Sequence, residues 1–348
     1  MIPVQNVYYM LSYAFRVLNE QGYKSIKTEQ FHNVAELCAA ILTKGVVYQL
    51  KRGLEKNYIA ETEALSSLKG KIEISESIKT LSRIHGQLIC TYDDFSVNSY
   101  MNRIIKTTMT ILLKSKISKV RKKKLKGLLV YFSNVKLIDI HTINWHTYYN
   151  RNNQSYRMLV SVCYLVIKGL LQTKSDGSSK LMDFLDEQRM CRLYEKFILE
   201  YYRREFPQIT ANASQINWQL DDGFDDLLPI MRTDIMLTYK NQILIIDAKY
   251  YTHSLHEQYG RLSAYSNNLY QIFTYVKNKE VEMANKPHGK IAGMLLYAQT
   301  EEEGPFEKNY KMSGNPISVK TLNLNRDFSD IKEQLNYIAE KYLKVGVA

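Results

Sequence analysis

Apolar residues in the carboxyl-terminal half of the chain gather in runs of strand length that are separated by polar segments. Residues 230–237 and 243–251 form two such runs, and both are rich in isoleucine and other aliphatic side chains. The polar residues 238–242 between them are about as many as a hairpin connection needs. This pattern predicts two adjacent strands joined by a short turn.

One acidic residue interrupts each of these runs, Asp234 in the first and Asp247 in the second. A buried strand seldom accepts an unpaired carboxylate, because removing its charge from water is costly. Lys249 follows Asp247 by two residues, and side chains two apart on a strand point to the same face. We therefore expect a cluster of two carboxylates and one ammonium group at one end of a twisted sheet.

The expected cluster has the chemistry of a magnesium site. Two carboxylates about 4 Å apart repel by roughly 4 kcal/mol at an effective dielectric constant of about 20, and a shared divalent cation converts this repulsion into attraction. Such a cation binds a phosphodiester oxygen and lowers the pKa of a bound water, while Lys249 orients that water or neutralises the developing charge. The alternative is a structural cluster, in which Asp234 and Lys249 form a cross-strand ion pair and Asp247 caps a turn.

These residues resemble the PD-(D/E)xK nuclease superfamily. Asp234 corresponds to its first acidic position, and Asp247, Ala248 and Lys249 correspond to its second acidic position and its lysine. The resemblance implies a restriction-endonuclease-like α/β core that cleaves DNA, with Asp234, Asp247 and Lys249 catalytic. It also implies that Mg²⁺ is held by the two aspartates and the backbone carbonyl of Ala248. Thr233 stands where the superfamily's name places a proline, at a position that varies.

Two helical patterns flank these runs and contain further candidate residues. Residues 193–202 have helical apolar spacing and contain Glu195, and residues 269–276 place Gln271 and Tyr275 four apart on one face. In the superfamily, a glutamate on the helix before the core strands often faces the metal, and a Q-x-x-x-Y element supports the site in several branches. The alternatives are a solvated helix glutamate at Glu195, and helix packing with one hydrogen bond for Gln271 and Tyr275.

Landmarks in the rest of the chain resemble the McrC family of restriction-system subunits over essentially the whole length. They are, in order, residues 2–14 (IPVQNVYYMLSYA), 68–72 (LKGKI), 90–96 (CTYDDFS) and 102–106 (NRIIK). The resemblance implies an endonuclease subunit that cuts double-stranded DNA containing methylated cytosine. It also implies a partner, a hexameric AAA+ GTPase of McrB type, which recognises and translocates the DNA while this chain stimulates its GTP hydrolysis.

The chain has no phosphate-binding motif of its own for GTP. No G-x-x-x-x-G-K-[ST] sequence occurs in it, so GTP hydrolysis must belong to a partner. A double-strand cut ordinarily requires two nuclease domains, and we therefore expect two of these subunits to pair in the assembled complex. Two alternatives remain open: a non-catalytic adaptor that activates the GTPase through its amino-terminal half, and a free-standing DNA repair nuclease that needs no partner.

Length and composition predict a two-domain protein that is α+β overall. The 348 residues, 45% of them hydrophobic, exceed a usual single core, and the best loop pattern near the middle is at residues 174–179. We place a mixed helical domain with a small β segment at residues 1–172 and the α/β nuclease core at residues 173–348. The four cysteines are scattered, and no apolar run reaches the length of a membrane span, which predicts a soluble, cytoplasmic protein.

The formal net charge of +12 indicates a polyanionic partner, because excess lysine and arginine attract phosphate groups. A basic segment between residues 114 and 126 has no acidic residue and contains Lys114, Lys116, Lys119, Arg121, Lys122, Lys123, Lys124 and Lys126. We expect this segment to contact DNA or the acidic surface of a partner. The alternative is a solvated helix face.

The remaining patterns predict further elements and two weaker candidate sites. Helices are expected at residues 33–54, 96–113 with Ser96 as N-cap, 156–171 and 330–342, and strands within 57–74 and at 291–297. His253 and His256 have helical metal-ligand spacing but no third ligand nearby. An acidic group before the first run is a second cation site or, more simply, a solvated loop; its members are Asp221, Asp222, Asp225 and Asp226.

Overall fold

The helices and strands of the chain, in this computed structural model, divide between two units. The described residues are 2–19, 23, 26, 29, 31–145, 147–149, 153–171, 187–223, 227–250, 256–258, 261–263, 265–284, 289–299 and 304–346. Unit 1 comprises Met1–Glu20, Lys27–His32 and Met182–Ala348, and unit 2 comprises Gln21–Ile26 and Asn33–Leu181. Each unit contains both helices and strands, which confirms the predicted α+β class.

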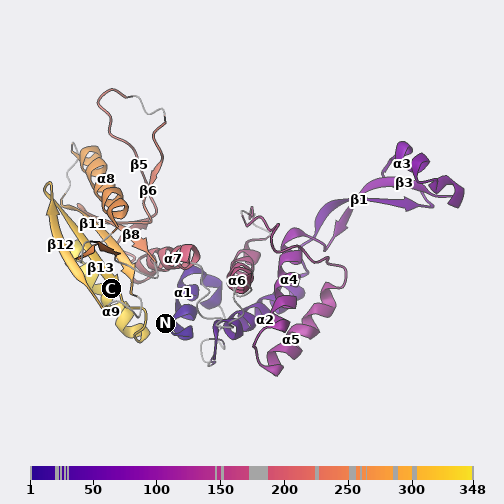
Figure 1. Ribbon diagram of the computed structural model, residues 1–348, viewed down its shortest axis with the longest axis horizontal. Coiled ribbons are helices and arrows are strands. Elements are labelled where there is room, and N and C mark those ends of the chain that lie inside the picture. Colours follow the sequence, from indigo (N-terminus) through magenta and orange to yellow (C-terminus); the bar gives the residue numbers. More distant parts are fainter. Residues whose placement is uncertain are drawn as a thin grey trace. The chain divides into compact units, whose positions relative to one another are not determined.

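The centre of unit 1 is a mixed six-stranded sheet in the order β12-β13-β11-β8-β7-β4 (Figure 1). Its strands are β4 (Thr210–Asn212), β7 (Ile235–Tyr239), β8 (Gln242–Lys249), β11 (Ile291–Ala298), β12 (Glu307–Met312) and β13 (Asn315–Leu322). The central strands β8, β11 and β13 run parallel, and β7 and β12 pair antiparallel on either side of them. Both β8 and β11 are almost continuously buried, as parallel strands covered on both faces should be.

Helices pack against both faces of this sheet. On one face, α8 (Ser266–Met283) joins a core cluster in which Ile272 packs with Ile245 and other apolar side chains of the sheet. Because side chains alternate along a strand, the even-numbered residues of β8 point to the opposite face. Two further helices contact β8, namely α7 (Glu187–Glu205) and α9 (Phe328–Leu343). Strand β8 is thus fixed by packing on several sides.

The first helix of the chain belongs to unit 1, although it lies far away in the sequence. The buried Asn6 of α1 (Val4–Ala14) donates from Nδ2 to the carbonyl of Leu324 at 2.8 Å, and Tyr13 donates its hydroxyl to Glu205 at 2.7 Å. A short 3₁₀ turn, η1 (Arg16–Asn19), follows α1. The predicted division at residue 172 grouped this helix with the amino-terminal domain, and the contacts instead group it with the six-stranded sheet. The helix pattern itself gives no information about a partner more than 300 residues away.

Unit 2 contains a group of packed helices. They are α2 (Val34–Arg52), α4 (Tyr100–Lys114), α5 (Lys119–Leu129) and α6 (Gln154–Leu171), with a 3₁₀ turn η4 (Val130–Phe132) after α5. Helices α2 and α4 contact each other, and each of them also contacts α5 and α6. Gly45 allows α2 and α6 to approach closely, because a Cβ atom there would lie 2.2 Å from Cδ2 of Leu159. The predicted helices at residues 33–54 and 156–171 are confirmed.

The helix predicted to begin at Ser96 starts later. Ser99, rather than Ser96, is its N-cap, and the side chain of Ser99 accepts a hydrogen bond from the backbone N–H of Asn102. Residues 88–96 are instead the strand β3 (Leu88–Ser96), which pairs along its whole length with β1 (Asn57–Leu65). Pairing of Ser96 with Asn57 in β1 thus overrides the local helix pattern at Ser96.

Strands β1 and β3 are the stem of an arm, which we define as residues 57–96. A third strand, β2 (Lys71–Ile72), completes an antiparallel sheet in the order β1-β3-β2, and α3 (Ile74–Lys79) and the 3₁₀ turn η3 (Ser82–His85) lie at its end. Figure 1 shows the arm extending away from the helices of its own unit. Gly70 is required at its bend, because φ is +67° and a Cβ would lie 2.4 Å from the carbonyl oxygen of Thr91.

Most of the other predicted elements are present. The strand predicted at residues 291–297 is β11, and the final helix is α9. The loop predicted at residues 174–179 and the domain boundary beside it lie outside the described residues. Within the described residues, no helix is both long enough and apolar enough to cross a membrane.

Candidate active site

The predicted hairpin is formed by β7 and β8, which pair antiparallel from Ile235 with Ile246 to Tyr239 with Gln242. The first apolar run is not one strand, however. Its beginning forms β6 (Met231–Arg232), which pairs with β5 (Gln215–Ile216) in a separate two-stranded sheet. Asp234 lies between β6 and β7, at the point where the chain leaves one sheet and enters the other.

This break frees the first motif carboxylate for a role in the site. Continuing the register of Ile235 with Ile246 by one residue brings Asp234 opposite Asp247. The side chain of Asp234 accepts a hydrogen bond from the backbone N–H of Ala248, with 2.9 Å between Oδ2 and the nitrogen. One carboxylate oxygen is therefore fixed by the neighbouring strand, and the two motif aspartates lie side by side.

The second motif carboxylate is buried beside the motif lysine. Asp247 is 1% exposed, and Nζ of Lys249 lies 3.0 Å from its Oδ1 and 2.9 Å from its Oδ2. Burial raises the pKa of Asp247, the Lys249 ammonium opposes this shift, and the nearby Asp234 adds to it. The turn-capping role that the alternative gave to Asp247 is wrong, because Asp247 lies within β8, where it pairs with Lys249.

Glu195 joins the two aspartates from α7. Burial raises its pKa to about 7, and repulsion from Asp234 contributes to the shift, while hydrogen bonding to Cys191 and the charge of Lys249 oppose it. This glutamate is therefore not a solvated helix carboxylate. It lies close enough to Asp234 and Lys249 for their charges to act on it.

Cys191 is a neighbour of the site that the sequence gave no reason to select. Its thiol lies 3.1 Å from Oε1 of Glu195, one helical turn away, and 3.5 Å from the carbonyl oxygen of Ala248. The pKa of Cys191 is raised to about 12, mainly by burial, so the thiol stays protonated and can donate. The spacing of four residues on a helix was the only signal that could have paired it with Glu195.

The other two candidates form a chain of hydrogen bonds that begins at the motif lysine. Nζ of Lys249 lies 3.5 Å from Oε1 of Gln271, whose Nε2 donates to the hydroxyl of Tyr275 at 2.8 Å. Tyr275 in turn donates to the carbonyl of Arg232 at 3.1 Å. The pair on α8 thus connects Lys249 to the end of β6, which is more than helix packing alone provides.

The residues gathered here fit a hard divalent cation in their donor chemistry. Asp234, Asp247, Glu195 and the Ala248 carbonyl offer oxygen atoms, and Oδ2 of the buried Asp247 has the ion-pair contact with Lys249 but no hydrogen bond within the described residues. Over the same residues, no three His, Cys, Asp or Glu side chains lie close enough to hold a metal ion by themselves. A cation bound here would therefore need the backbone carbonyl as well as side chains, and it would compete with Lys249 for Asp247.

The remaining candidates lie elsewhere. Most of the basic segment is exposed on α5 and on the residues before it, but Arg121 is turned inward, with Nε 3.4 Å from Oε2 of Glu36. Asp221 and Asp222 are exposed. Asp225, Asp226 and His253 lie outside the described residues, and His256 begins the short strand β9 (His256–Gln258), which pairs with β10 (Arg261–Ser263).

Comparison with known proteins identifies the family. A family model described as "McrBC 5-methylcytosine restriction system component" matches residues 4–298. An Escherichia coli (strain K12) protein described as "Type IV methyl-directed restriction enzyme EcoKMcrBC" is 31% identical over 350 residues, covering 99% of this chain and 99% of that protein.

Two solved structures from Thermococcus gammatolerans are also similar to the chain. One, a half-complex from a tetradecameric assembly of McrB AAA+ hexamers with bound McrC, aligns over 97% of this chain and 76% of its own, at 17% identity and a TM-score of 0.48. The other, a McrBC complex, aligns over 58% of each chain at 19% identity and a TM-score of 0.40. The family model and the E. coli relative are sufficient by themselves: the chain belongs to the McrBC 5-methylcytosine restriction system component family.

Proposed function

We propose that this chain is the endonuclease subunit of a GTP-dependent restriction complex that cuts DNA containing modified cytosine. The observation that supports this most directly is the cluster at the end of β8, where Asp234, Asp247 and Glu195 lie with Lys249 and the Ala248 carbonyl. Membership of a methylcytosine restriction family supports the choice of DNA as the substrate. The cluster has the composition of a PD-(D/E)xK nuclease site.

In phosphodiester hydrolysis, the residues of the cluster would have two different roles, cation binding and charge neutralisation. A bound Mg²⁺ would polarise the phosphodiester and lower the pKa of a coordinated water. Asp234, Asp247 and the Ala248 carbonyl would hold the ion, and Asp234 is already oriented by its hydrogen bond from the Ala248 N–H. Lys249 is positioned by Asp247 and Gln271, from where its ammonium orients the attacking water or neutralises charge on the phosphate oxygens.

The partner in this proposal is a hexameric AAA+ GTPase of McrB type, and the chain stimulates its GTP hydrolysis. The names of the family and of the E. coli relative both contain McrBC, which supports a second component of McrB type. The sequence has no GTP-binding motif of its own, which is consistent with a motor that acts in trans. We propose that two such subunits pair in the assembled complex, because cutting both DNA strands ordinarily requires two nuclease domains.

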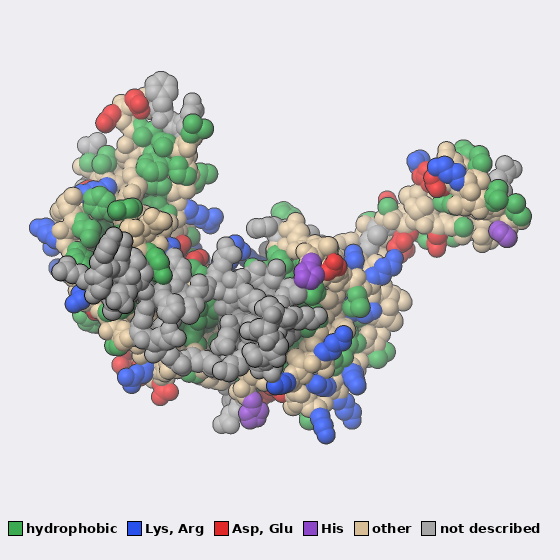
Figure 2. Space-filling view, viewed as in Figure 1, with side chains coloured by type: hydrophobic (Ala, Val, Ile, Leu, Met, Phe, Trp, Pro, Cys, Tyr) green, Lys and Arg blue, Asp and Glu red, His purple; other side chains and the backbone are tan. Residues whose placement is uncertain are grey.

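The arm supports a docking role in addition to catalysis. Its end exposes several large aliphatic side chains, seen as hydrophobic surface in Figure 2: Leu68, Ile74, Ile78, Leu81 and Ile84. Ile74 and Ile78 lie one turn apart on α3 and therefore share a face. An apolar group of this kind at the end of an extended arm suits a protein partner better than water or DNA. We therefore propose that the chain both cuts DNA and docks onto its partner, so that the adaptor role is a second activity of the same chain.

The basic segment suits a polyanion. Its exposed lysines are Lys114, Lys116, Lys119, Lys123, Lys124 and Lys126. The first turn of α5 contains Lys119, Arg121 and Lys122 and no acidic residue, although positive charge at a helix N-terminus costs roughly 0.3–1 kcal/mol per group. Helix stability alone does not favour that placement. We assign this surface to DNA backbone contacts, with the acidic surface of the motor as the alternative.

The experiment that tests the proposed function compares wild type with Asp247→Ala on methylated and unmethylated plasmid. Reactions contain Mg²⁺, with and without GTP and the co-purified AAA+ partner. Cutting that requires the partner, GTP, methylation and Asp247 supports the proposal in full. Cutting by the chain alone would identify a free-standing nuclease, and partner-dependent cutting that survives Asp247→Ala would leave the chain as an adaptor.

A further inference from the structure

Both ends of the arm are held by a single side chain. Asn102, in the first turn of α4, is fully buried, and its Nδ2 donates to the carbonyl of Glu55 at 2.9 Å and to that of Val97 at 2.8 Å. Glu55 lies two residues before β1, and Val97 directly follows β3. The two strands of the arm therefore leave the helices of unit 2 from one shared amide.

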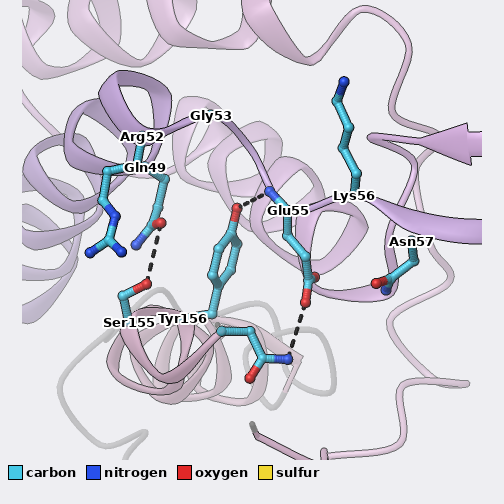
Figure 3. Close-up of a pocket in the computed structure, with 9 residues that line it drawn as sticks. Gln49, Arg52, Gly53, Glu55, Lys56, Asn57, Ser155 and Tyr156 are labelled. Carbon is cyan, nitrogen blue, oxygen red and sulfur yellow. Dashed lines mark hydrogen bonds between the residues drawn. The ribbon is translucent and has the colours of Figure 1, made fainter. Parts of the chain in front are cut away.

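Glu55 is tied down at each of its polar groups. Its backbone N–H donates to the hydroxyl of Tyr156 at 2.8 Å, and its carboxylate accepts from Ser99 at 2.8 Å and from Asn153 at 3.1 Å. The Tyr156 hydroxyl then donates to Oδ1 of Asn102 at 3.0 Å, which closes the network. Figure 3 shows Tyr156 and Glu55 meeting at the start of the arm. We call Asn102, Glu55 and Tyr156 the clamp.

Without the clamp, the surrounding residues would allow the arm to rotate relative to the helices of unit 2. Gly53, which ends α2 at a φ of +85°, lies two residues before Glu55, and a Cβ there would meet no atom within 4 Å. Beside it lies a cavity of about 240 Å³, lined by Gly53, Glu55, Tyr156 and polar residues such as Gln49 and Ser155. Apolar packing therefore contributes little at this point. The direction of the arm depends on buried hydrogen bonds, which are costly to leave unmade.

The clamp also explains the sequence segment 102–106, one of the family landmarks, which has no role in the nuclease site. In the segment 102–106, Asn102 holds the arm, and the other two polar residues hold the segment that follows α5. Lys106 donates to the carbonyls of Phe132 and Val135, and Arg103 donates to that of Leu137 at 3.3 Å. One turn of α4 thus fixes two segments of unit 2 through backbone carbonyls.

We propose that Asn102 is a positioning residue for partner coupling: with Glu55 and Tyr156 it locks both ends of the arm, so that force applied at the apolar end reaches the helices of unit 2. This inference rests on the proposed function in one respect, namely that the arm docks into the partner. A flexible arm could still bind, because the residues at its end are unchanged, but it would transmit little force. Loss of the clamp should therefore reduce stimulation of the partner more than binding.

The first test measures the arm in the chain alone. Spin labels are attached at Ile84→Cys, near the end of the arm, and at Gly127→Cys on α5, where a Cβ meets no atom within 4 Å. Cys191 is replaced by serine in every sample, so that the labels attach only at the introduced cysteines. The other three native cysteines are buried and are kept. Pulsed electron spin resonance should give one narrow distance in this parent and a broad distribution in Asn102→Ala. An equally narrow distribution in Asn102→Ala would overturn the clamp.

Two further variants separate loss of the clamp from loss of the fold. Tyr156→Phe removes only the hydroxyl that joins Glu55 to Asn102, and it should broaden the distribution while the chain stays folded. Tyr100→Phe is the matched control, because it removes a hydroxyl from the same turn of α4 that contacts Asn144 rather than the arm. The control should keep the narrow distance of the parent. Broadening in the control to the same extent would contradict the assignment.

The second test adds the AAA+ partner and uses full-length chain. At saturating concentration, stimulation of GTP hydrolysis should fall about tenfold in Tyr156→Phe and Asn102→Ala, as expected for losing one or two buried hydrogen bonds, while the Kd for the partner changes less than about threefold. Unchanged stimulation in both variants would overturn the coupling role. If the wild-type chain itself gives no stimulation, the proposed function fails, and the distance measurement still decides whether the clamp exists.

Discussion

The nuclease cluster and the end of the arm are opposite departures from ordinary burial. In the cluster, Asp247 is 1% exposed, although a buried carboxylate is costly. On the arm, Ile84 is 75% exposed, although burying an isoleucine side chain contributes roughly 1.5–3 kcal/mol. Burial alone favours neither arrangement in the isolated chain. Each becomes favourable when something binds, a cation and a phosphate in the first case and an apolar protein surface in the second.

This comparison shows how binding sites can be found in a chain from burial alone. The buried carboxylate and the exposed aliphatic group depart from the usual burial pattern in opposite senses, and they call for opposite kinds of partner. It also predicts that the two regions can be disabled separately, because one belongs to unit 1 and the other to unit 2. The following changes test that separation, beginning with the largest expected effect.

Asp247→Ala should lower the rate of DNA cutting by about a thousandfold or more, because it removes a cation ligand and a partner of Lys249. The rate of plasmid nicking and linearisation measures this loss. GTP hydrolysis by the partner should be stimulated as in wild type. Asp221→Ala, which removes an exposed aspartate from the same unit, is the matched control and should cut normally. A loss of stimulation in Asp247→Ala would show that the two regions are not separable.

Ile78→Glu should weaken binding to the AAA+ partner by about tenfold to a hundredfold, because it replaces an exposed aliphatic side chain of α3 by a charge. Cutting should fall in parallel at limiting partner concentration and recover when the partner is in excess. Fluorescence anisotropy of labelled chain gives the Kd. Ser75→Glu adds the same charge to the same helix without removing an apolar group, and should have the smaller effect. Equal effects of both variants would favour simple charge repulsion.

The Mg²⁺ concentration for half-maximal cutting should fall as pH rises. The pKa of Glu195 is raised to about 7, so below that pH a cation must displace a proton, and affinity should change by about tenfold per pH unit. Without the cation, ionising Glu195 in the folded chain is disfavoured, so the free energy of unfolding falls as pH rises from about 4.5 to about 7. Glu195→Gln should make both profiles shallower, and the remaining slope belongs to Asp247, whose pKa is also raised by burial. Unchanged profiles in this variant would remove Glu195 from the site.

Lys123→Gln combined with Lys124→Gln should have the smallest effect, a few-fold loss of DNA affinity at moderate salt. The slope of log affinity against log salt concentration should fall by about two, since each phosphate contact contributes roughly one. Binding to a short duplex over a range of salt concentrations measures it. Arg121→Gln is the informative control, because Arg121 pairs with Glu36 and should affect stability more than the salt slope. An unchanged slope in the double variant would assign the lysines to a protein surface.

The local elements of the site followed from the sequence. Two apolar runs of strand length around a short polar segment predict the hairpin of β7 and β8, and the two-residue period of a strand places Asp247 and Lys249 on one face. The four-residue spacing on α8 predicts that Gln271 and Tyr275 can bond, which they do. These features depend on residues within a few positions of one another, so the pattern contains the information needed.

The tertiary structure alone decided which distant elements meet. The break between β6 and β7, which frees Asp234, depends on pairing with β5, and the meeting of Glu195 with Asp234 depends on α7 packing beside β8. Three further features differ from the sequence prediction or were not part of it. Helix α1 belongs to unit 1, α4 begins at Tyr100, and the end of the arm is exposed. Local periodicity fixes what a segment is and which of its faces is apolar. Which partner covers that face, or whether any does, depends on contacts across hundreds of residues that no local pattern encodes.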